Sequence, residues 1–368
     1  MKYRQHKLCL WALSAALALG AAVPATAQVP QGYPAEYQSV IDAAKKEGKV
    51  VVYSTTDGAT ASHLVKDFEA AYGIKVEFND LNSTELYNRF IAEVAAGQGT
   101  GDVTWSSAAD LQVKLTNDGY AKAYKSPEAA NIPKWANYKD MAYGVTYEPV
   151  AIVYNKRLVP QADVPKTHGD LLALLQAKSA DYKGKVTAYD PERSGVGFLF
   201  FTQDDLAWKS AWDLFRAFGK SEIKLYTSVG AMMERITSGE HLIGYGVFGS
   251  YALSRSKKDP NLGVVLPTDY SLIASRVAFL SDKAKNPNAG KLFLDYLLSK
   301  RGQGIIANQA ELYSLRSDVE GEATVEKVKA QIGEAARPIV IDGELAGNLD
   351  RMKRLRFLKQ WQAALQGK

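Results

Sequence analysis

Three short loops combine hydroxyl side chains with small residues in a pattern that suits anion binding. They lie at 54–58, 106–109 and 193–195, each after an apolar run and before a predicted helix. Hydroxyl groups and the free backbone N–H groups at a helix start bind phosphate, phosphonate or carboxylate groups. Taken alone, the loop at 193–195 is better explained by an ordinary serine N-cap, so the prediction depends on all three loops occurring together. The candidate ligand-binding residues in these loops are Thr55, Thr56, Asp57, Ser106, Ser107, Ser194 and Gly195.

The remaining motifs indicate neither a catalytic centre nor a metal site. Residues 244–249 form a G-x-G-x-x-G sequence followed by Asp269, as in dinucleotide-binding folds. However, Pro260 and Pro267 interrupt the region where the next helix and strand of such a fold would run, so we interpret these glycines as loop residues. The histidines at 63, 168 and 241 are not spaced as a metal pair, and no H-E-x-x-H or G-x-S-x-G motif occurs. We predict no catalytic residue, no bound metal and no cofactor.

The first residues of the chain predict an export signal. A cationic segment, 1–7, precedes the apolar run 8–23, and the small residues Ala25-Thr26-Ala27 end it. This run is shorter than the ~20 residues that a membrane-spanning helix needs. We therefore expect a Sec-type signal peptide that is cleaved after Ala27, and a protein located in the periplasm.

Charge and cysteine content exclude several classes of protein. The chain has 368 residues, a formal net charge of +5 and a single cysteine, Cys9. Removal of the predicted signal lowers the charge to +2 and removes the cysteine. This excludes disulfides, thiol nucleophiles and cysteine-ligated metals in the mature chain, and its near-neutral balance predicts no nucleic-acid partner. The length fits two domains of about 150 residues each.

Strands and helices alternate along the first half of the mature chain. We predict a helix over 36–46 and buried strands at 49–53, 74–78 and 102–105, with helices between them. This alternation is typical of a parallel sheet covered by helices, which binds ligands at the carboxyl ends of its strands. The loops 54–58 and 106–109 occupy that position. A second α/β region follows residue 143, in which 272–280 is predicted as one strand.

In their order and spacing, these segments resemble the periplasmic solute-binding proteins of ABC importers, specifically the type II branch that takes ferric iron or phosphorylated organic compounds. The resemblance covers nearly the whole mature chain. The segments that carry it are 49–54, 102–107, 147–155, 190–195, 285–303 and 313–319.

The resemblance implies an α/β, two-lobed periplasmic binding protein fold of type II. Two doubly wound sheets are joined by crossing strands, expected at 144–154 and 270–279, with a ligand cleft between lobes that close on the ligand. The expected lobes are 28–146 plus 270–308 for lobe 1, and 147–269 plus 309–368 for lobe 2.

One departure from the family pattern changes the expected ligand. Ferric members carry two adjacent tyrosines after the strand that corresponds to 241–246, whereas here Tyr245 and Tyr251 are separated. Ferric iron needs hard, anionic oxygen ligands, which a single phenolate supplies poorly. The resemblance then implies an anionic organic solute, with Tyr245, Thr268 and Asp269 completing the site. Asp269 is equally well explained as a solvated loop residue.

The predicted function is the capture of a small anionic solute by a monomer that delivers it to the transmembrane subunits of an ABC permease. Three alternatives remain open. The first is binding of a ferric ion through Tyr245 or Tyr270 with a synergistic anion. The second is a periplasmic sensor subunit that acts on a membrane kinase, and the third is an exported enzyme.

Overall fold

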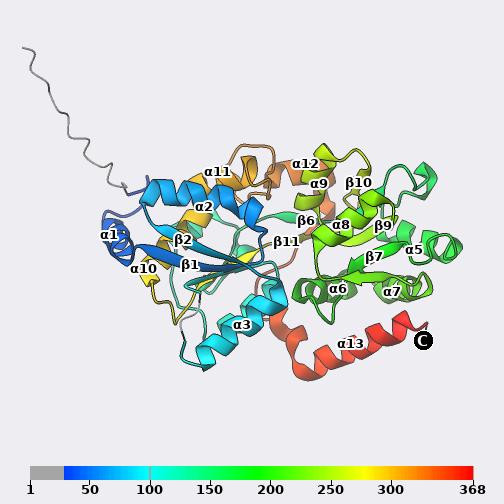
Figure 1. Cartoon of the computed structure of the whole chain (residues 1–368), viewed down its shortest axis with the longest axis horizontal. Helices are drawn as coiled ribbons and strands as arrows, with labels where there is room; N and C mark the ends of the chain where they lie inside the picture. Colours follow the sequence, from blue (N-terminus) through cyan, green and yellow to red (C-terminus); the bar gives the residue numbers. More distant parts are fainter. Residues whose placement is uncertain (1–28, 99–100, 368) are drawn as a thin grey trace, which may run out of the picture.

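The computed structural model describes residues 29–98 and 101–367 and contains two α/β lobes that lie side by side (Figure 1). Each lobe is built on one sheet that mixes parallel and antiparallel strands and is flanked by helices. The predicted α/β class and the two-lobed arrangement are therefore confirmed. The predicted signal peptide, residues 1–27, lies outside the described residues.

The first sheet has the strand order β2-β1-β3-β12-β5-β4, with β1 parallel to β2 and β3. Strand β12 enters antiparallel between β3 and β5. The strands are β1 (Lys49–Ser54), β2 (Lys75–Asp80), β3 (Val103–Ser106), β4 (Asn137–Tyr138), β5 (Ala142–Gly144) and β12 (Val277–Leu280). The helices of this lobe are α1 (Tyr37–Glu47), α2 (Gly58–Tyr72), α3 (Ser83–Ala95), α4 (Ala109–Asn117), α10 (Pro287–Leu298) and α11 (Lys300–Asn308).

Local sequence explains where these elements begin and end. Helix α1 buries Tyr37, Ile41 and Ala44, which share one face at helical spacing. It ends at Gly48, which adopts the left-handed conformation that glycine tolerates best. Helix α2 starts where the Asp57 carboxylate accepts the N–H groups of the first turn. The predicted βα alternation of this half is confirmed to within a few residues at each boundary.

The second sheet has the order β13-β11-β6-β9-β7-β8, and β10 also pairs with β6. Its strands are β6 (Glu148–Asn155), β7 (Val186–Tyr189), β8 (Lys224–Tyr226), β9 (Ile243–Phe248), β10 (Leu262–Val265), β11 (Ser271–Ala274) and β13 (Ala336–Pro338). The helices beside it are α5 (His168–Ala177), α6 (Gly195–Ala207), α7 (Ala211–Lys220), α8 (Val229–Ser238), α9 (Gly249–Lys258), α12 (Val325–Ile332) and α13 (Arg351–Leu365). Short 3-10 helices are η1 (Pro127–Asn131), η2 (Lys134–Ala136), η3 (Gln161–Asp163), η4 (Gly333–Ala335) and η5 (Leu345–Leu349).

The chain crosses between the two sheets at adjacent segments. One crossing joins β5 to β6, and the other joins β11 to β12 through Ser275 and Arg276. The two segments are hydrogen-bonded, since Val145 N–H donates to the Arg276 carbonyl and Arg276 N–H donates to Thr146 Oγ1, both at 2.9 Å. The prediction of one continuous strand over 272–280 is wrong, because its halves belong to different sheets. Consequently residues 271–274, expected in lobe 1, pair within the second sheet.

The C-terminal segment returns across both lobes. Short helix η5 packs against α4 of the first lobe, and α13 packs against α7 of the second. Figure 1 shows α13 along the lower edge of the molecule. Trp361 is the anchor of this helix in the second core, where it contacts Phe201 and Phe215.

Candidate functional site

A cleft of about 650 Å³ lies between the lobes at the carboxyl ends of β1 and β3. The first lobe contributes Thr55, Asp57, Asp80, Glu85 and Ser107, and the second contributes Tyr189, Thr227, Ser228, Tyr251, Arg255 and Lys258. Arg276, from the crossing segment, also lines it. The volume lies in the range that holds a small organic ligand.

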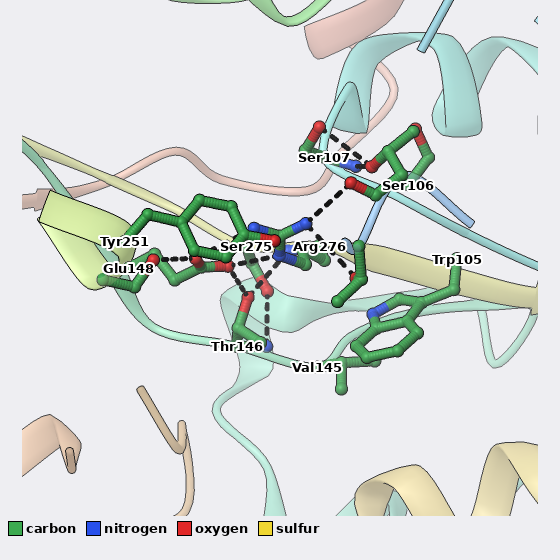
Figure 2. Close-up of polar contacts among 12 residues, drawn as sticks. Trp105, Ser106, Ser107, Val145, Thr146, Glu148, Tyr251, Ser275 and Arg276 are labelled. Carbon is green, nitrogen blue, oxygen red and sulfur yellow. Dashed lines mark hydrogen bonds and ion pairs between the residues drawn. The ribbon is translucent and has the colours of Figure 1, made fainter. Parts of the chain in front are cut away.

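Arg276 occupies the floor of this cleft as part of a buried ion pair. Its Nε lies 2.8 Å from Glu148 Oε1, and its Nη2 lies 3.2 Å from Glu148 Oε2. Its Nη1 donates to the Thr55 carbonyl and to Thr56 Oγ1, both at 3.2 Å. Figure 2 shows the guanidinium between Glu148 and the loop that carries Ser106 and Ser107. Although burial alone would lower it, the Glu148 carboxylate raises the pKa of Arg276, so the side chain is charged.

The surroundings of this pair hold it in one orientation. Glu148 also accepts hydrogen bonds from Thr146 Oγ1, at 2.8 Å, and from the Ser250 hydroxyl. The rings of Phe248 and Tyr251 each lie 5.1 Å from the guanidinium carbon of Arg276. Hydrogen bonds to other described residues use four of the five guanidinium N–H groups of Arg276. One N–H group of a fixed cation therefore remains for another acceptor.

The structure brings the two predicted lobe 1 loops together. Ser107 N–H donates to Thr55 Oγ1 at 2.8 Å, and the two hydroxyl oxygens are 3.0 Å apart. Thr55, Asp57 and Ser107 line the cleft. Thr56 and Ser106 are instead buried behind it, where Thr56 contacts Arg276 and Ser106 accepts the N–H of Ala108.

The start of α2, which was predicted to receive an anion, is occupied by groups of the protein itself. Asp57 Oδ1 accepts the N–H groups of Ala59 and Thr60, and Asp80 accepts that of Gly58 at 2.9 Å. The N–H of Asp57 donates to the hydroxyl of Tyr251, across the cleft, at 3.2 Å. This helix start is therefore a contact between lobes, with no N–H of its first turn left for an anion.

The predicted lobe 2 loop also makes contacts between lobes. Ser194 caps α6 by accepting the N–H of Gly197. Gly195 N–H donates to Thr84 Oγ1, and Val196 N–H donates to Ser83 Oγ, both at 3.2 Å. Hydroxyl groups of α3 thus fill the start of α6, and neither Ser194 nor Gly195 lines the cleft.

Three further predicted residues lie in a separate polar cluster of the second lobe. The Tyr245 hydroxyl donates to Asp204 Oδ2 at 2.8 Å, and Asp269 accepts both the backbone N–H and the ring Nδ1 of His168 at 3.0 Å. Thr268 is exposed beside them. The structure does not bring Tyr245, Thr268 or Asp269 to the cleft.

A tyrosine pair is present in this same cluster. The Tyr270 hydroxyl donates to Asp204 Oδ1 at 2.9 Å, opposite the bond from Tyr245. Burial raises the pKa of Asp204 to about 6, and burial also raises the pKa of both phenols. Both phenol groups are therefore protonated donors at neutral pH.

Several residues of the second lobe that line the cleft were not predicted from the sequence. Ser228 caps α8 through the N–H of Ala231, and Thr227 precedes it. Within 29–98 and 101–367, no hydrogen-bond acceptor is recorded for the N–H groups of Val229 and Gly230, which line the cleft. Arg255 and Lys258 of α9 stand on the same wall. Two signals were available: a serine directly before the apolar face of α8, and an arginine inside the apolar run 272–280.

No group of three or more His, Cys, Asp and Glu side chains in 29–98 and 101–367 is arranged to hold a metal ion. In the same ranges, no helix has the length and apolar character needed to cross a membrane.

Comparison with known proteins gives consistent matches. The profile of the family described as bacterial extracellular solute-binding protein matches residues 63–331. A substrate-binding protein of an ABC transporter from Agrobacterium tumefaciens is 36% identical, with a TM-score of 0.82 over 86% of this chain and 94% of that chain.

Two more distant structures share the fold. The periplasmic binding protein AfuA from Actinobacillus pleuropneumoniae, with fructose-6-phosphate bound, is 21% identical with a TM-score of 0.70 over 87% of this chain and 99% of that one. Iron-bound HitA from Pseudomonas aeruginosa is 19% identical with a TM-score of 0.66 over 86% and 99% of the two chains.

Proposed function

This chain belongs to the bacterial extracellular solute-binding proteins of ABC transporters, and we propose that it captures a small organic solute that carries a phosphate, phosphonate or carboxylate group. The observation that carries this proposal is the wall of the second lobe. There Val229 and Gly230, whose N–H groups have no acceptor among the described residues, line the cleft together with Arg255 and Lys258. An uncompensated helix start with two nearby cations attracts an anionic group.

The opposite wall supports a solute with a second polar end. Asp57, Asp80 and Glu85 of the first lobe line the cleft across from those cations. The hydroxyl groups of Thr55 and Ser107 lie between the two walls, next to Arg276. A solute with an anionic group at one end and hydroxyl or ammonium groups at the other complements both walls. Sugar phosphates and aminophosphonates have this chemistry.

Lobe closure follows from a ligand of this kind. A solute that contacts both walls binds the closed form more tightly than the open form, and it stabilises the closed form by that difference in affinity. The hydrogen bond between Asp57 and Tyr251 and those between α3 and α6 also join the two lobes, and they would add to the stability of the closed form. We propose that the closed form is the one that an ABC permease receives, and that the protein reaches the periplasm after cleavage at Ala27.

A melting-shift screen followed by calorimetry tests the ligand class. Fructose-6-phosphate, 2-aminoethylphosphonate and a dicarboxylate are compared with fructose, ethylamine and ferric chloride. We expect the melting temperature to rise only with ligands that carry an anionic organic group. Equal shifts with neutral fructose would contradict the proposal, and a coloured complex with ferric chloride alone would favour iron.

Two adjacent lysines provide a matched pair of variants. Lys258 lines the cleft, whereas Lys257 of the same helix contacts Glu311 outside it. We expect Lys258→Gln to weaken the anionic ligand about tenfold and Lys257→Gln to leave its affinity within twofold. Equal losses of affinity in the two variants would show that the general surface charge of the protein, and not Lys258 in the cleft, attracts the ligand. Recovery of the ligand unchanged after incubation separates binding from enzymatic turnover.

A further inference from the structure

A second cavity lies between the lobes on the other side of the α3–α6 contact. Its volume is about 570 Å³, and it is bordered by α3 and α4 of the first lobe, α6 of the second, η5 and α13. The α3–α6 contact separates this cavity from the cleft, because neighbouring residues of these two helices line different spaces. Ser83 and Val196 line the first cleft, whereas Thr84 and Gly195 line this cavity. The two spaces are therefore adjacent and distinct.

The interior of this second cavity is mainly apolar. Leu111 enters from α4, Phe198 from α6, Leu349 from η5, and Leu355 and Leu358 from α13. Leu355 keeps 45% of its surface exposed, so its side chain is accessible to an occupant of the cavity. Apolar surface of this extent gains free energy when an apolar group covers it.

The cavity also carries a concentration of positive charge. Lys114, Arg351 and Arg354 line it, and no Asp or Glu of the described residues 29–98 and 101–367 does so. Lys114 is paired with Asp118 at 2.7 Å. For Arg351 and Arg354, no ion pair is found within the described parts of the chain, and the Arg354 guanidinium lies 5.4 Å from the Phe198 ring centre. Two uncompensated guanidinium groups thus border an apolar space.

Asp110 and Asp350 are each adjacent in the sequence to lining residues, and neither forms an ion pair with the two arginines. Asp350 instead accepts the N–H groups of Met352 and Lys353 at the start of α13. Asp110, in the first turn of α4, is buried and accepts the N–H of Leu111 at 2.8 Å. Burial raises its pKa to about 7, and Arg354 lowers it only in part. The charge of the cavity therefore favours an anionic occupant.

We propose that this cavity is a second binding site, separate from the solute cleft, for an amphipathic anion: a carboxylate or phosphate group attached to an apolar chain. The acid group binds Arg351 and Arg354, and the chain lies against Leu111, Phe198, Leu355 and Leu358. Both lobes and α13 contribute to the site, so an occupant contacts all three and stabilises their present arrangement. The proposal is independent of the ligand in the cleft.

Calorimetry with decanoate, in the absence of any cleft ligand, tests this site. We expect one decanoate to bind per chain and neutral decanol to bind at least tenfold more weakly. Helix α13 supplies a matched pair of double variants. Arg351→Gln/Arg354→Gln removes the two cations of the cavity, whereas Lys353→Gln/Arg356→Gln removes two that do not line it. We expect at least a tenfold loss of decanoate affinity for the first and less than a twofold change for the second.

Two further experiments complete the test. One checks that loss of binding does not reflect misfolding, and the other distinguishes a free amphipathic anion from a lipid surface. Leu355→Glu places a carboxylate at an already exposed position and is expected to abolish binding while leaving the melting temperature within 2 °C or so of the wild type. Equal losses in both double variants, or equal binding of decanol, would overturn the proposal. Co-sedimentation with phosphatidylglycerol vesicles without saturable decanoate binding would also overturn it, because it would indicate a charged surface and no enclosed site.

Discussion

Arg276 and Glu148 form a two-point ion pair at the junction of the two lobes, with 2.8 Å between Nε and Oε1 and 3.2 Å between Nη2 and Oε2. Glu148 begins β6 of the second sheet, and Arg276 lies in the segment that leads into β12 of the first. The same guanidinium bonds the backbone of Thr55 and the side chain of Thr56. One side chain therefore connects the floor of the cleft to both lobes.

Loss of this arginine should be strongly destabilising. Arg276→Ala leaves the carboxylate of Glu148 buried without its partner, which costs about 3–5 kcal/mol. The double variant Arg276→Met/Glu148→Gln removes the charge as well and should recover most of that loss. Arg301→Ala, which breaks the exposed pair with Asp67, should cost about 1 kcal/mol or less. Urea unfolding measures all three, and equal losses for Arg276→Ala and Arg301→Ala would contradict this account.

Enlarging Gly195 should hold the lobes apart. A Cβ at this position would lie 2.6 Å from Leu111 Cδ1 and 3.1 Å from Ser83 Oγ, both in the first lobe. Gly195→Val should therefore weaken the cleft ligand at least tenfold and increase the radius of gyration that small-angle scattering measures with ligand present. Gly304→Val, at a helix position with open space around it, is the control. A wild-type radius of gyration for Gly195→Val would show that Leu111 and Ser83 can move to accommodate the larger side chain while the lobes stay closed.

The Tyr251 hydroxyl should contribute to closure separately from its ring. Tyr251→Phe keeps the ring beside Arg276 but removes the acceptor of the Asp57 N–H across the cleft. We expect a threefold to tenfold loss of ligand affinity, which corresponds to about 1 kcal/mol for one hydrogen bond. Tyr226→Phe removes a hydroxyl that bonds His241 away from the cleft and serves as control. Calorimetry measures both affinities. Identical values for the two variants would show that the bond from the Asp57 N–H to the Tyr251 hydroxyl does not contribute to ligand binding.

Asp110 should make stability fall as the pH rises. Burial raises the pKa of Asp110 from 3.8 to about 7, so the folded protein holds this proton more tightly than the unfolded chain. The stabilisation is complete below about pH 4 and is lost as the pH rises through 7. Asp110→Asn does not titrate, so its melting temperature should rise relative to the wild type between pH 5 and pH 8.

Comparison with the wild type at each pH cancels the contribution of the other buried carboxyl groups. Asp181→Asn, at an exposed position, is the matched control and should follow the wild type throughout. If the melting temperatures of Asp110→Asn and the wild type differed by the same amount at every pH from 5 to 8, the expected titration of Asp110 would be contradicted.

Much of the fold was predictable because it depends on local patterns. The apolar runs at 49–53 and 102–105 form β1 and β3, and Gly48 and Gly73 end the helices that the spacing predicted. The prediction of one strand over 272–280 was wrong, because an apolar run indicates that residues are buried but not which sheet they belong to. The one charged residue in that run, Arg276, lies where the chain crosses from β11 to β12.

The site was less predictable than the fold. Thr55 and Ser107 meet because parallel strands end at the same edge of a sheet, which chain order alone implies. Tyr245 points away from the cleft because neighbouring residues of β9 face opposite sides of the sheet, and a shift of one residue reverses the prediction. Ser194 and Gly195 start a helix as expected, but α3 of the other lobe occupies that start.

The sequence by itself determined the α/β class and the adjacency of the hydroxyl loops at 54–58 and 106–109, because hydrophobic period and the order of strands and helices along the chain are read directly from it. The two-lobed organisation was implied by the family resemblance. Only the tertiary structure decided which helix start faces the cleft and remains available to a ligand. That choice depends on partners far away in the chain, such as Glu148 for Arg276, 128 residues apart. A hydroxyl or an N–H group binds a ligand only where folding has left it without a partner in the protein.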